Sequence, residues 1–297
     1  MFGLVKIFNR YLNLTKPTIV VLVAITGITT MMAEGSIFLE PAKMWMVLLM
    51  TVVAAGSANA LNQFIDRDID SIMDRTRKRR PLPLEQVSPR TALLFGIFLA
   101  LISTFYFWME VNPLTAIISL STILFYVFIY TLWLKRRHYY NIVIGGAAGA
   151  TAPLIASAAA TGEISTLAWI LFWIIFMWTP PHFWALALAI KDEYEKVKIP
   201  MLPNVLGDKR TIIEIYIYTI LLLPLTILPF FLGAASIVYV VAATLLWIWY
   251  MRESFLRLKE QTRPAYKKLF FVSIFYLFFV FIAIGLDGWL RYAGVIS

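Results

Sequence analysis

The chain has 297 residues, of which 61% are hydrophobic, 15% aromatic and only 14% charged. This composition is too apolar for a soluble domain and predicts an all-α polytopic membrane protein. The sequence contains no cysteine, which excludes disulfides, thiolate metal sites and cysteine nucleophiles, so any bound metal must use oxygen or histidine ligands. The formal net charge of +9 requires no nucleic acid, because a basic surface that faces anionic lipid explains it.

Apolar segments of about 17 to 25 residues, the length that a bilayer requires, recur along the whole chain. We expect about nine transmembrane helices in one membrane domain that covers residues 1–297. Their expected positions are residues 18–33, 44–64, 91–108, 113–134, 141–161, 165–190, 212–232, 235–251 and 269–290.

The distribution of basic residues supports this arrangement when the N-terminus is placed on the cytoplasmic side. Only Lys43 and Arg291 then fall outside, so that 24 of the 26 lysines and arginines lie in inner segments. The segment ahead of the first span is too short and too polar for a cleaved signal or a transit peptide. These features favour the inner (plasma) membrane of a prokaryote.

An acidic and then basic run, NQFIDRDIDSIMDRTRKRRPLP, begins at Asn62, at the end of the second span. Asn62, Asp66 and Asp70 recur every four residues, so on a helix they form one stripe that drifts by about 40° per step. A carboxylate at the centre of a bilayer costs about 2.5 to 3.5 kcal/mol, although the cost falls toward the interface. These three residues are therefore interpreted as functional.

Other charged residues of the same run, within the inner loop 65–90, are expected to be bystanders. Asp68 lies about 200° round the helix from Asp66, and therefore faces elsewhere. Together with Asp74 it is expected to belong to a solvated salt-bridge surface. Arg79 and Arg80, near the end of the run, are interpreted as anchors to lipid headgroups.

A second polar run, KDEYEKVKIPMLPNVLGDKR, follows the sixth span in the inner loop 191–211. Two even-numbered spans end on the same side of the membrane, so both polar runs can face one cavity. These carboxylates are too many to lie together without cations, and Mg²⁺ ions bound to a diphosphate would neutralise their charge. The basic residues expected to bind that diphosphate are Arg67, Arg75, Arg77, Lys78, Lys135 and Lys191.

These motifs carry a resemblance to a known family. An Asn-x-x-x-Asp-x-x-x-Asp motif at the end of the second span, with an acidic cluster after the sixth, resembles the UbiA superfamily of intramembrane prenyltransferases. The narrower resemblance is to the protohaem IX farnesyltransferases, or haem O synthases. It rests on the first polar run and on LTKPTI, YTLWLKRRHYYNIVIGGAAGA, WTPPHFWALAL and KDEYEKVKIPMLP. The last third of the chain is hydrophobic but contains no motif that supports this resemblance.

The resemblance implies a fold, a reaction and a set of partners. The fold is a UbiA-type helical bundle, and the reaction is farnesyl transfer from farnesyl diphosphate to a vinyl group of haem B. Water addition then gives haem O for haem-copper oxidases, so haem A synthase or oxidase assembly proteins are implied as partners. The implied metal ligands are Asn62, Asp66, Asp70, Asp192 and Glu193, and the implied catalytic residues are Asp66, Asp70, Asp192 and His182.

The second acidic cluster departs from the usual pattern of the superfamily. That pattern is Asp-x-x-x-Asp, whereas Lys196 stands four residues after Asp192 in this sequence. Which of Asp192, Glu193 and Glu195 binds the metal therefore stays open.

His182 indicates where the acceptor binds. It lies about nine residues before Asp192 in the sixth span, or about 14 Å deeper along a regular helix. A hydrogen bond between helices and a contact with haem are both compatible with this position. Gly145 and Gly149 can serve close helix packing or leave room for a flat tetrapyrrole, and Tyr130 is a second candidate for steering water.

Three alternatives remain open from the sequence. The first is a UbiA-type enzyme that prenylates an aromatic quinone precursor, although the WTPPHFW segment favours haem. The second is a transporter, whose charged groups would be expected nearer the bilayer midplane. The third is a haem-binding membrane protein without catalytic activity, which would bind haem but release no diphosphate.

Overall fold

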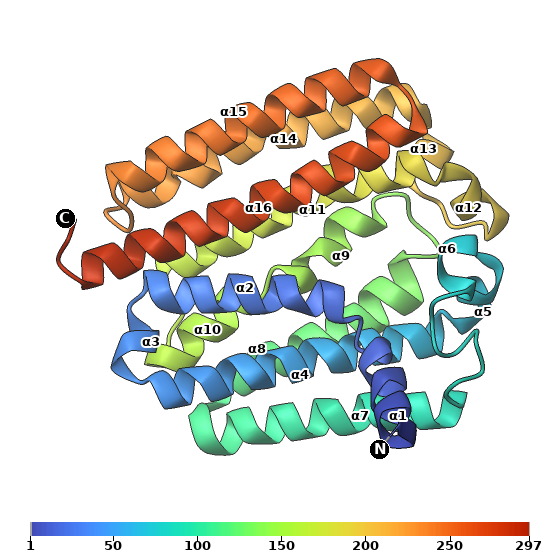
Figure 1. Cartoon of the computed structure of the whole chain (residues 1–297), viewed down its shortest axis with the longest axis horizontal. Coiled ribbons are helices and arrows are strands. Elements are labelled where there is room, and N and C mark those ends of the chain that lie inside the picture. The colour runs from blue at the N-terminus through green and yellow to red at the C-terminus, as the bar shows by residue number, and fades with distance from the viewer. Residues whose placement is uncertain (1, 297) are drawn as a thin grey trace.

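The computed structural model describes residues 2–296, with side chains from residue 5 on, and this part of the chain is helical and contains no strand (Figure 1). The helices of the first half are α1 (Phe2–Leu14), α2 (Pro17–Ala33), α3 (Ser36–Leu39), α4 (Pro41–Ile65), α5 (Arg67–Ile72), α6 (Asp74–Arg77), α7 (Pro89–Tyr106), η1 (Phe107–Val111), α8 (Pro113–Leu124) and η2 (Phe125–Leu134). Those of the second half are α9 (Asn141–Gly149), α10 (Ala152–Thr161), α11 (Thr166–Ala189), α12 (Lys191–Lys196), α13 (Leu202–Val205), α14 (Gly207–Phe231), α15 (Ile237–Glu260) and α16 (Arg263–Tyr292).

The starts of the long helices follow from local chemistry. Proline occupies the first helical position of α2, α4, α7 and α8, where its missing N–H leaves no hydrogen bond unmade. Ser88, Asn112 and Ser165 cap α7, α8 and α11, because each side-chain oxygen accepts a hydrogen bond from a backbone N–H of the first turn. These signals can be read from the sequence.

The long helices form an integral membrane protein. Within residues 2–296, seven helical segments are long and apolar enough to cross a bilayer, or eight if α1 and α2, which are bent by 67°, form one span. Each expected span coincides with a helical segment, but α15, whose last turns carry several charges, is not among those seven or eight. The count of nine and the cytoplasmic N-terminus therefore stay predictions.

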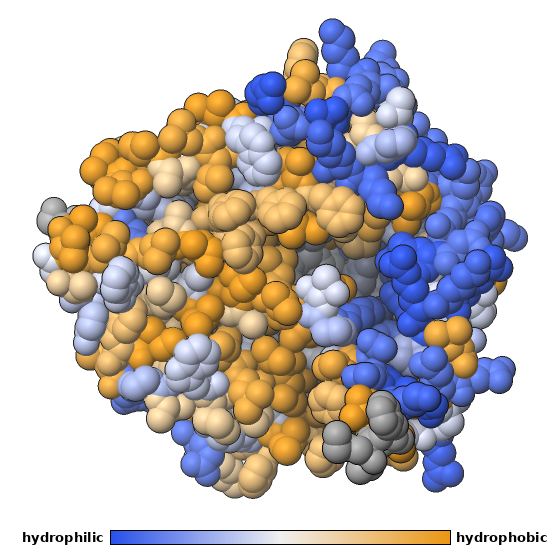
Figure 2. Space-filling model, in the orientation of Figure 1, coloured by the Kyte–Doolittle hydropathy of each residue, from blue (hydrophilic) through white to orange (hydrophobic). Residues whose placement is uncertain are grey.

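Both polar runs lie at one end of the bundle. The short helices α5, α6, α12 and α13 gather at the right of Figure 1, where the long helices end or begin. Hydrophilic residues cover this end in Figure 2, whereas the flank of the bundle is largely hydrophobic. We call it the polar end. The expectation that the two inner loops share one face agrees with this arrangement.

Two main clusters of buried apolar side chains hold the bundle together. The larger lies among α11, α14, α15 and α16, and the second lies among α2, α4 and α10. A smaller cluster at the polar end joins the two inner loops, and it contains Ile69, Met73, Tyr130 and Tyr194. The candidate site is built beside this smaller cluster.

Candidate functional site at the polar end

Asn62, Asp66 and Asp70 form one buried stripe, as their spacing predicts. The chain changes from α4 to α5 at Asp66, yet the N–H of Asp66 donates to the carbonyl of Asn62 and the N–H of Asp70 to that of Asp66, both at 2.9 Å. Helical spacing is thereby kept across the junction. Their relative exposures are 2%, 0% and 3%, so the stripe faces the interior of the protein.

Asp66 lies at the centre of a network of polar side chains. Its carboxylate forms an ion pair with Lys135, and its Oδ2 accepts a hydrogen bond from Asn62 Nδ2 at 2.9 Å. The same amide group also donates to Thr131 Oγ1 at 3.1 Å. Asp66 Oδ1 is buried and has no hydrogen-bond partner among the described residues, so this oxygen is available to a further ligand.

The other two members of the stripe also contact basic side chains. Arg80 forms an ion pair with Asp70, which shows that the interpretation of Arg80 as a lipid anchor was wrong. Lys16 Nζ donates to Asn62 Oδ1 at 2.6 Å. Each member of the stripe thus contacts a different cation, and two of these cations, Lys16 and Lys135, come from distant parts of the chain.

The two expected bystanders of the first run are exposed, and Asp68 connects to this network through Arg136, whose Nη2 also lies 3.9 Å from Asp66 Oδ1. Both oxygens of Asp68 accept hydrogen bonds of 2.8 Å from Arg136, at the protein surface. Hydrogen bonding by Arg136 lowers the pKa of Asp68, and the carboxylate in turn raises the pKa of Arg136. Asp74 is exposed and pairs with Arg77 and Lys196. Both carboxylates behave as a solvated salt-bridge surface.

The second acidic cluster meets the first through Glu193. Tyr194 is buried in the small apolar cluster, and this packing docks α12 against α5 and α6. The backbone N–H of Arg75 donates to Glu193 Oε2 at 3.0 Å. Asp192, by contrast, is exposed and pairs with Arg263 at the start of α16. Within the described residues, no three acidic or histidine side chains group as metal ligands, so the structure does not bring Asp192 to the stripe.

The basic residues expected at a diphosphate have mixed positions. Lys135 touches the stripe directly. Arg67 instead donates to the carbonyl of Phe64 at 2.7 Å and stacks on its ring, and Lys191 pairs with Asp208 at 2.7 Å. The side chains of Arg75, Arg77 and Lys78 are exposed at the polar end.

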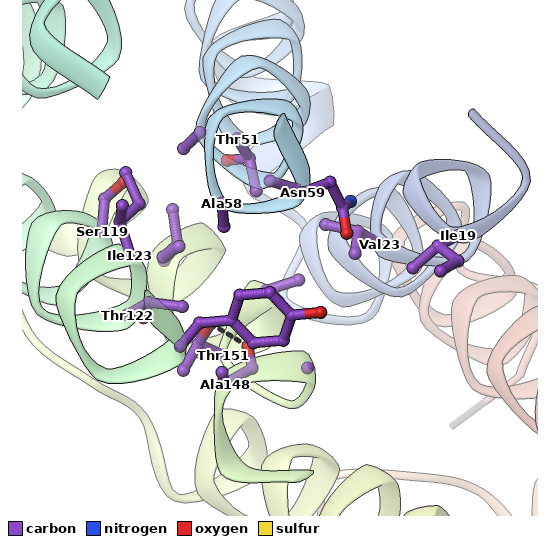
Figure 3. A pocket seen from close by; sticks show the side chains of 16 residues that line it. Ile19, Val23, Thr51, Ala58, Asn59, Ser119, Thr122, Ile123, Ala148 and Thr151 are labelled. Atoms are coloured by element: carbon purple, nitrogen blue, oxygen red, sulfur yellow. Dashed lines mark hydrogen bonds between the residues drawn. The ribbon is translucent and has the colours of Figure 1, made fainter. Parts of the chain in front are cut away.

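An apolar cavity of about 100 Å³ opens along the same helix as the stripe (Figure 3). Thr51, Ala58 and Asn59 of α4 line it, and Asn59 lies one turn before Asn62. The opposite walls come from α2, α8, α9 and α10. A ligand could therefore extend from the polar stripe into a hydrocarbon-like space.

The two predicted acceptor glycines differ in their surroundings. A Cβ added to Gly145 would lie 2.2 Å from the ring of Tyr130, so this glycine serves close packing of the ring on α9. Gly149 lines the cavity, and no described atom lies within 4 Å of a Cβ added there. Close packing therefore explains Gly145, while Gly149 leaves open space.

His182 is held between α11 and α16. Its ring stacks between Trp178 and Phe270, with centroid distances of 4.2 and 4.4 Å, and its Nδ1 lies 2.7 Å from Ser273 Oγ. Ser273 gives its single hydroxyl proton to the carbonyl of Phe270 at 2.7 Å. In the tautomer that donates from His182 Nδ1 to this hydroxyl, a lone pair remains on Nε2. His182 does not line the apolar cavity.

The model of the UbiA prenyltransferase family matches residues 20–286. The chain belongs to the UbiA prenyltransferase family. It is 47% identical to a protein of Gloeobacter violaceus named protoheme IX farnesyltransferase, over 94% of this chain and 92% of that protein. A Trichodesmium erythraeum protein of the same name is 42% identical over 96% of this chain and 88% of its own length.

Solved structures of UbiA proteins have the same fold. The structure of a digeranylgeranylglyceryl phosphate synthase superposes with a TM-score of 0.78 at 19% identity and covers 95% of this chain and 99% of its own. A UbiA homologue from Archaeoglobus fulgidus, bound to DMAPP and Mg²⁺, gives 0.65 at 16% identity over 93% and 99%. The expected UbiA-type bundle is thus confirmed.

Three residues of this UbiA-family site were not assigned to it from the sequence. Arg80 was interpreted as a lipid anchor, and Thr131 looked like an ordinary residue of an apolar span. Lys16 lies within LTKPTI, but nothing in that motif indicates a contact 46 residues along the chain. The only local signal was the proline after Lys16, which indicates a helix start.

Proposed function

We propose that this chain transfers the farnesyl group of farnesyl diphosphate to a vinyl group of haem B, with addition of water, giving haem O and diphosphate. The product would serve the biosynthesis of haem-copper oxidase cofactors. The names of the relatives support haem as the acceptor. The observation that carries the proposal is that α4 lines the apolar cavity through Thr51 and Ala58 and ends in Asn62 and Asp66.

The chemistry of the stripe fits a magnesium ion. Asp66 Oδ1 accepts no hydrogen bond within the described residues and lies 3.9 Å from Arg136 Nη2, and Asn62 and Asp70 add further oxygens of the kind that Mg²⁺ prefers. These three residues would hold the ion, and Asp192 and Glu193 of α12 stay further candidate ligands, although Asp192 pairs with Arg263 in this structure. When bound, magnesium supplies positive charge that favours departure of the diphosphate.

Basic side chains of this chain would stabilise the leaving diphosphate. Lys135 and Arg80 contact the stripe, so their charge is already in place beside a group at the mouth of the cavity. Charge that is preorganised in this way lowers a barrier, because no reorganisation is required as the negative charge develops. Further candidates for contacts with the diphosphate at the polar end are Arg67, Arg75, Arg77, Lys78 and Lys191.

The reaction balances with one molecule of water. The bond between farnesyl C1 and oxygen breaks, and the diphosphate leaves with the electron pair. The terminal vinyl carbon of haem forms the new bond to C1, and water adds to the neighbouring vinyl carbon with loss of a proton. The apolar cavity would shield the allylic cation from premature capture by water.

His182 and Tyr130 are the proposed residues of the acceptor side. The lone pair on His182 Nε2 suits either axial contact with haem iron or orientation of the attacking water. Tyr130 packs on Gly145 near the stripe, and Gly149 borders the cavity. These roles complete the proposed site.

The proposed cellular setting follows from the charge distribution. The polar end would face the cytoplasm from the inner membrane of a prokaryote, because the basic residues gather there. The chain would act as one domain, residues 1–297, with inner loops 65–90 and 191–211 carrying the site. Haem A synthase or oxidase assembly proteins are the proposed protein partners.

Expression in a host that lacks its own enzyme tests the reaction. Haems extracted from these cells and analysed by mass spectrometry should include haem B with the added mass of one farnesyl group and one water. Only unchanged haem B in cells that contain the folded protein would contradict the proposal. Prenylated aromatic compounds would instead point to a quinone precursor as acceptor.

A further inference from the structure

Lys16 occupies an unusual break in the chain. α1 ends at Leu14, α2 begins at Pro17, and the two helices meet at 67°. Lys16 itself adopts a left-handed backbone conformation, with φ 53° and ψ 67°. Residues other than glycine rarely adopt this conformation, and those that do cluster at functional sites.

Amide side chains of α4 hold this break in place. Pro17 has no N–H, so the carbonyl of Asn13 cannot form the usual helical hydrogen bond to it. Gln63 Nε2 donates instead to the carbonyls of Asn13 and Leu14, both at 2.9 Å. Asn59 Nδ2 donates to the carbonyl of Thr15 at 3.0 Å. The break is therefore a fixed feature that α4 supports.

The break directs the ammonium group of Lys16 toward the stripe. Lys16 Nζ lies 2.6 Å from Asn62 Oδ1, and Ile19, three residues after Lys16, lines the cavity together with Asn59. Lys135 and Arg80 contact the same stripe, but each has a carboxylate partner. Lys16 forms no ion pair with any described residue, and its side-chain acceptor there is a neutral amide.

A partly buried ammonium without an anionic partner is costly, because the loss of water is not offset by a countercharge. We propose that Lys16 is a diphosphate-binding residue, and that the break between α1 and α2 presents it to the oxygens of the prenyl diphosphate. This inference rests on the proposed function and adds a residue to its leaving-group site. Asn62 Oδ1 would hold the ammonium in place until the substrate arrives.

Binding of farnesyl diphosphate tests the proposal. The full-length protein in lipid nanodiscs is titrated with farnesyl diphosphate and magnesium, without haem. Lys16→Met, which keeps the length of the side chain and the same backbone demand, should weaken binding by about tenfold or more, because a charge-assisted contact is lost. Lys16→Arg should bind within about threefold of the wild type. Lys6→Met, at an exposed position of α1, is the matched control and should bind as the wild type does.

Thermal unfolding without ligand separates binding from folding. Lys16→Met should unfold at the wild-type temperature or above it, because the variant removes an ammonium that has no ion pair. Wild-type affinity in Lys16→Met, or a loss of affinity that only accompanies a lower unfolding temperature, would overturn the inference. Failure of the wild type itself to bind farnesyl diphosphate would overturn the proposed function as well.

Discussion

At the scale of single residues, burial separates the carboxylates that spacing alone could only suggest. Asp66 and Asp70 are buried and held by Lys135 and Arg80, whereas Asp68, in the same short segment, is exposed and binds Arg136. A helix that turns 100° per residue produces this contrast. Adjacent acidic residues in such a run therefore should not be treated as equivalent.

Substitution of Asp66 tests this distinction. Asp66→Asn keeps the size of the side chain but removes its charge and replaces one of the two carboxylate oxygens with an amide nitrogen. We expect haem O formation by the purified protein to fall by about 100-fold or more, because one preorganised charge in an active site has an effect of this size. The measurement is chromatography of the haem products with mass detection.

Asp68→Asn is the matched control, since it makes the same chemical change two residues away. It should alter turnover by less than about twofold, because exposed ion pairs contribute little. Equal losses of turnover in the two variants would show that turnover depends on the net charge of the loop and not on the buried stripe.

Most of this site could be predicted from the sequence, because the stripe is a local pattern. Spacing of four residues is sufficient to predict that Asn62, Asp66 and Asp70 share a face, and the structure keeps them together. Partners from distant segments could not be predicted in the same way. The pairing of Asp192 with Arg263 depends on how α16 packs beside α12, which no local pattern encodes.

At the scale of elements, α4 is the helix that joins the two halves of the proposed chemistry. One end of its face lines the apolar cavity, and the other carries the stripe. Opposite it, α9 supplies both tight packing at Gly145 and open space at Gly149. Glycine thus permits close packing at one position of α9 and leaves open space four residues later.

Paired substitutions in α9 test whether the cavity receives the prenyl chain. Gly149→Leu should leave the unfolding temperature nearly unchanged, because its side chain enters open space, but should weaken farnesyl diphosphate binding by about tenfold. Gly145→Ala should lower stability by about 1 to 3 kcal/mol, because its methyl group would overlap the ring of Tyr130. Thermal unfolding and ligand titration of both variants check this.

Undiminished affinity in Gly149→Leu would exclude this cavity as the site of the chain. A stable Gly145→Ala variant would mean that the Tyr130 ring can move aside, and the packing of η2 on α9 would then be looser than described.

The helices themselves were largely predictable, because apolar length and proline positions are local properties. Every expected span matches a helical segment, and Gly233, in a left-handed backbone conformation, lies in the turn between α14 and α15. The break at Lys16 was not predicted. It depends on Gln63 and Asn59, which lie more than 40 residues away.

At the scale of the whole molecule, a buried polar cluster lies at the end of the bundle opposite to the proposed site. At the end away from the polar end, buried Asp287 accepts hydrogen bonds from the backbone N–H and hydroxyl of Ser236 and pairs with Arg291. Arg291 also donates to the carbonyl of Ala234 at 2.6 Å. This cluster ties the turn between α14 and α15 to α16 (Figure 1).

Breaking this cluster should affect stability and spare the reaction. Asp287→Asn is expected to cost about 1 to 3 kcal/mol, because it weakens the hydrogen bonds and removes the ion pair of a buried carboxylate. Its unfolding temperature should fall, while turnover below that temperature stays near the wild-type value. Glu40→Gln, which removes an exposed pair with Lys43, should cost about 0.5 kcal/mol or less. A folded Asp287→Asn protein without turnover would contradict this separation.

The most direct test of the central claim is a reaction with purified protein in lipid nanodiscs. Haem B, farnesyl diphosphate and magnesium are supplied in ¹⁸O-labelled water, and the haem products are analysed by mass spectrometry. The account predicts a haem that has gained one farnesyl group and one labelled hydroxyl, with release of diphosphate. Recovery of unmodified haem B, together with prenylation of an aromatic acceptor by the same preparation, would contradict it.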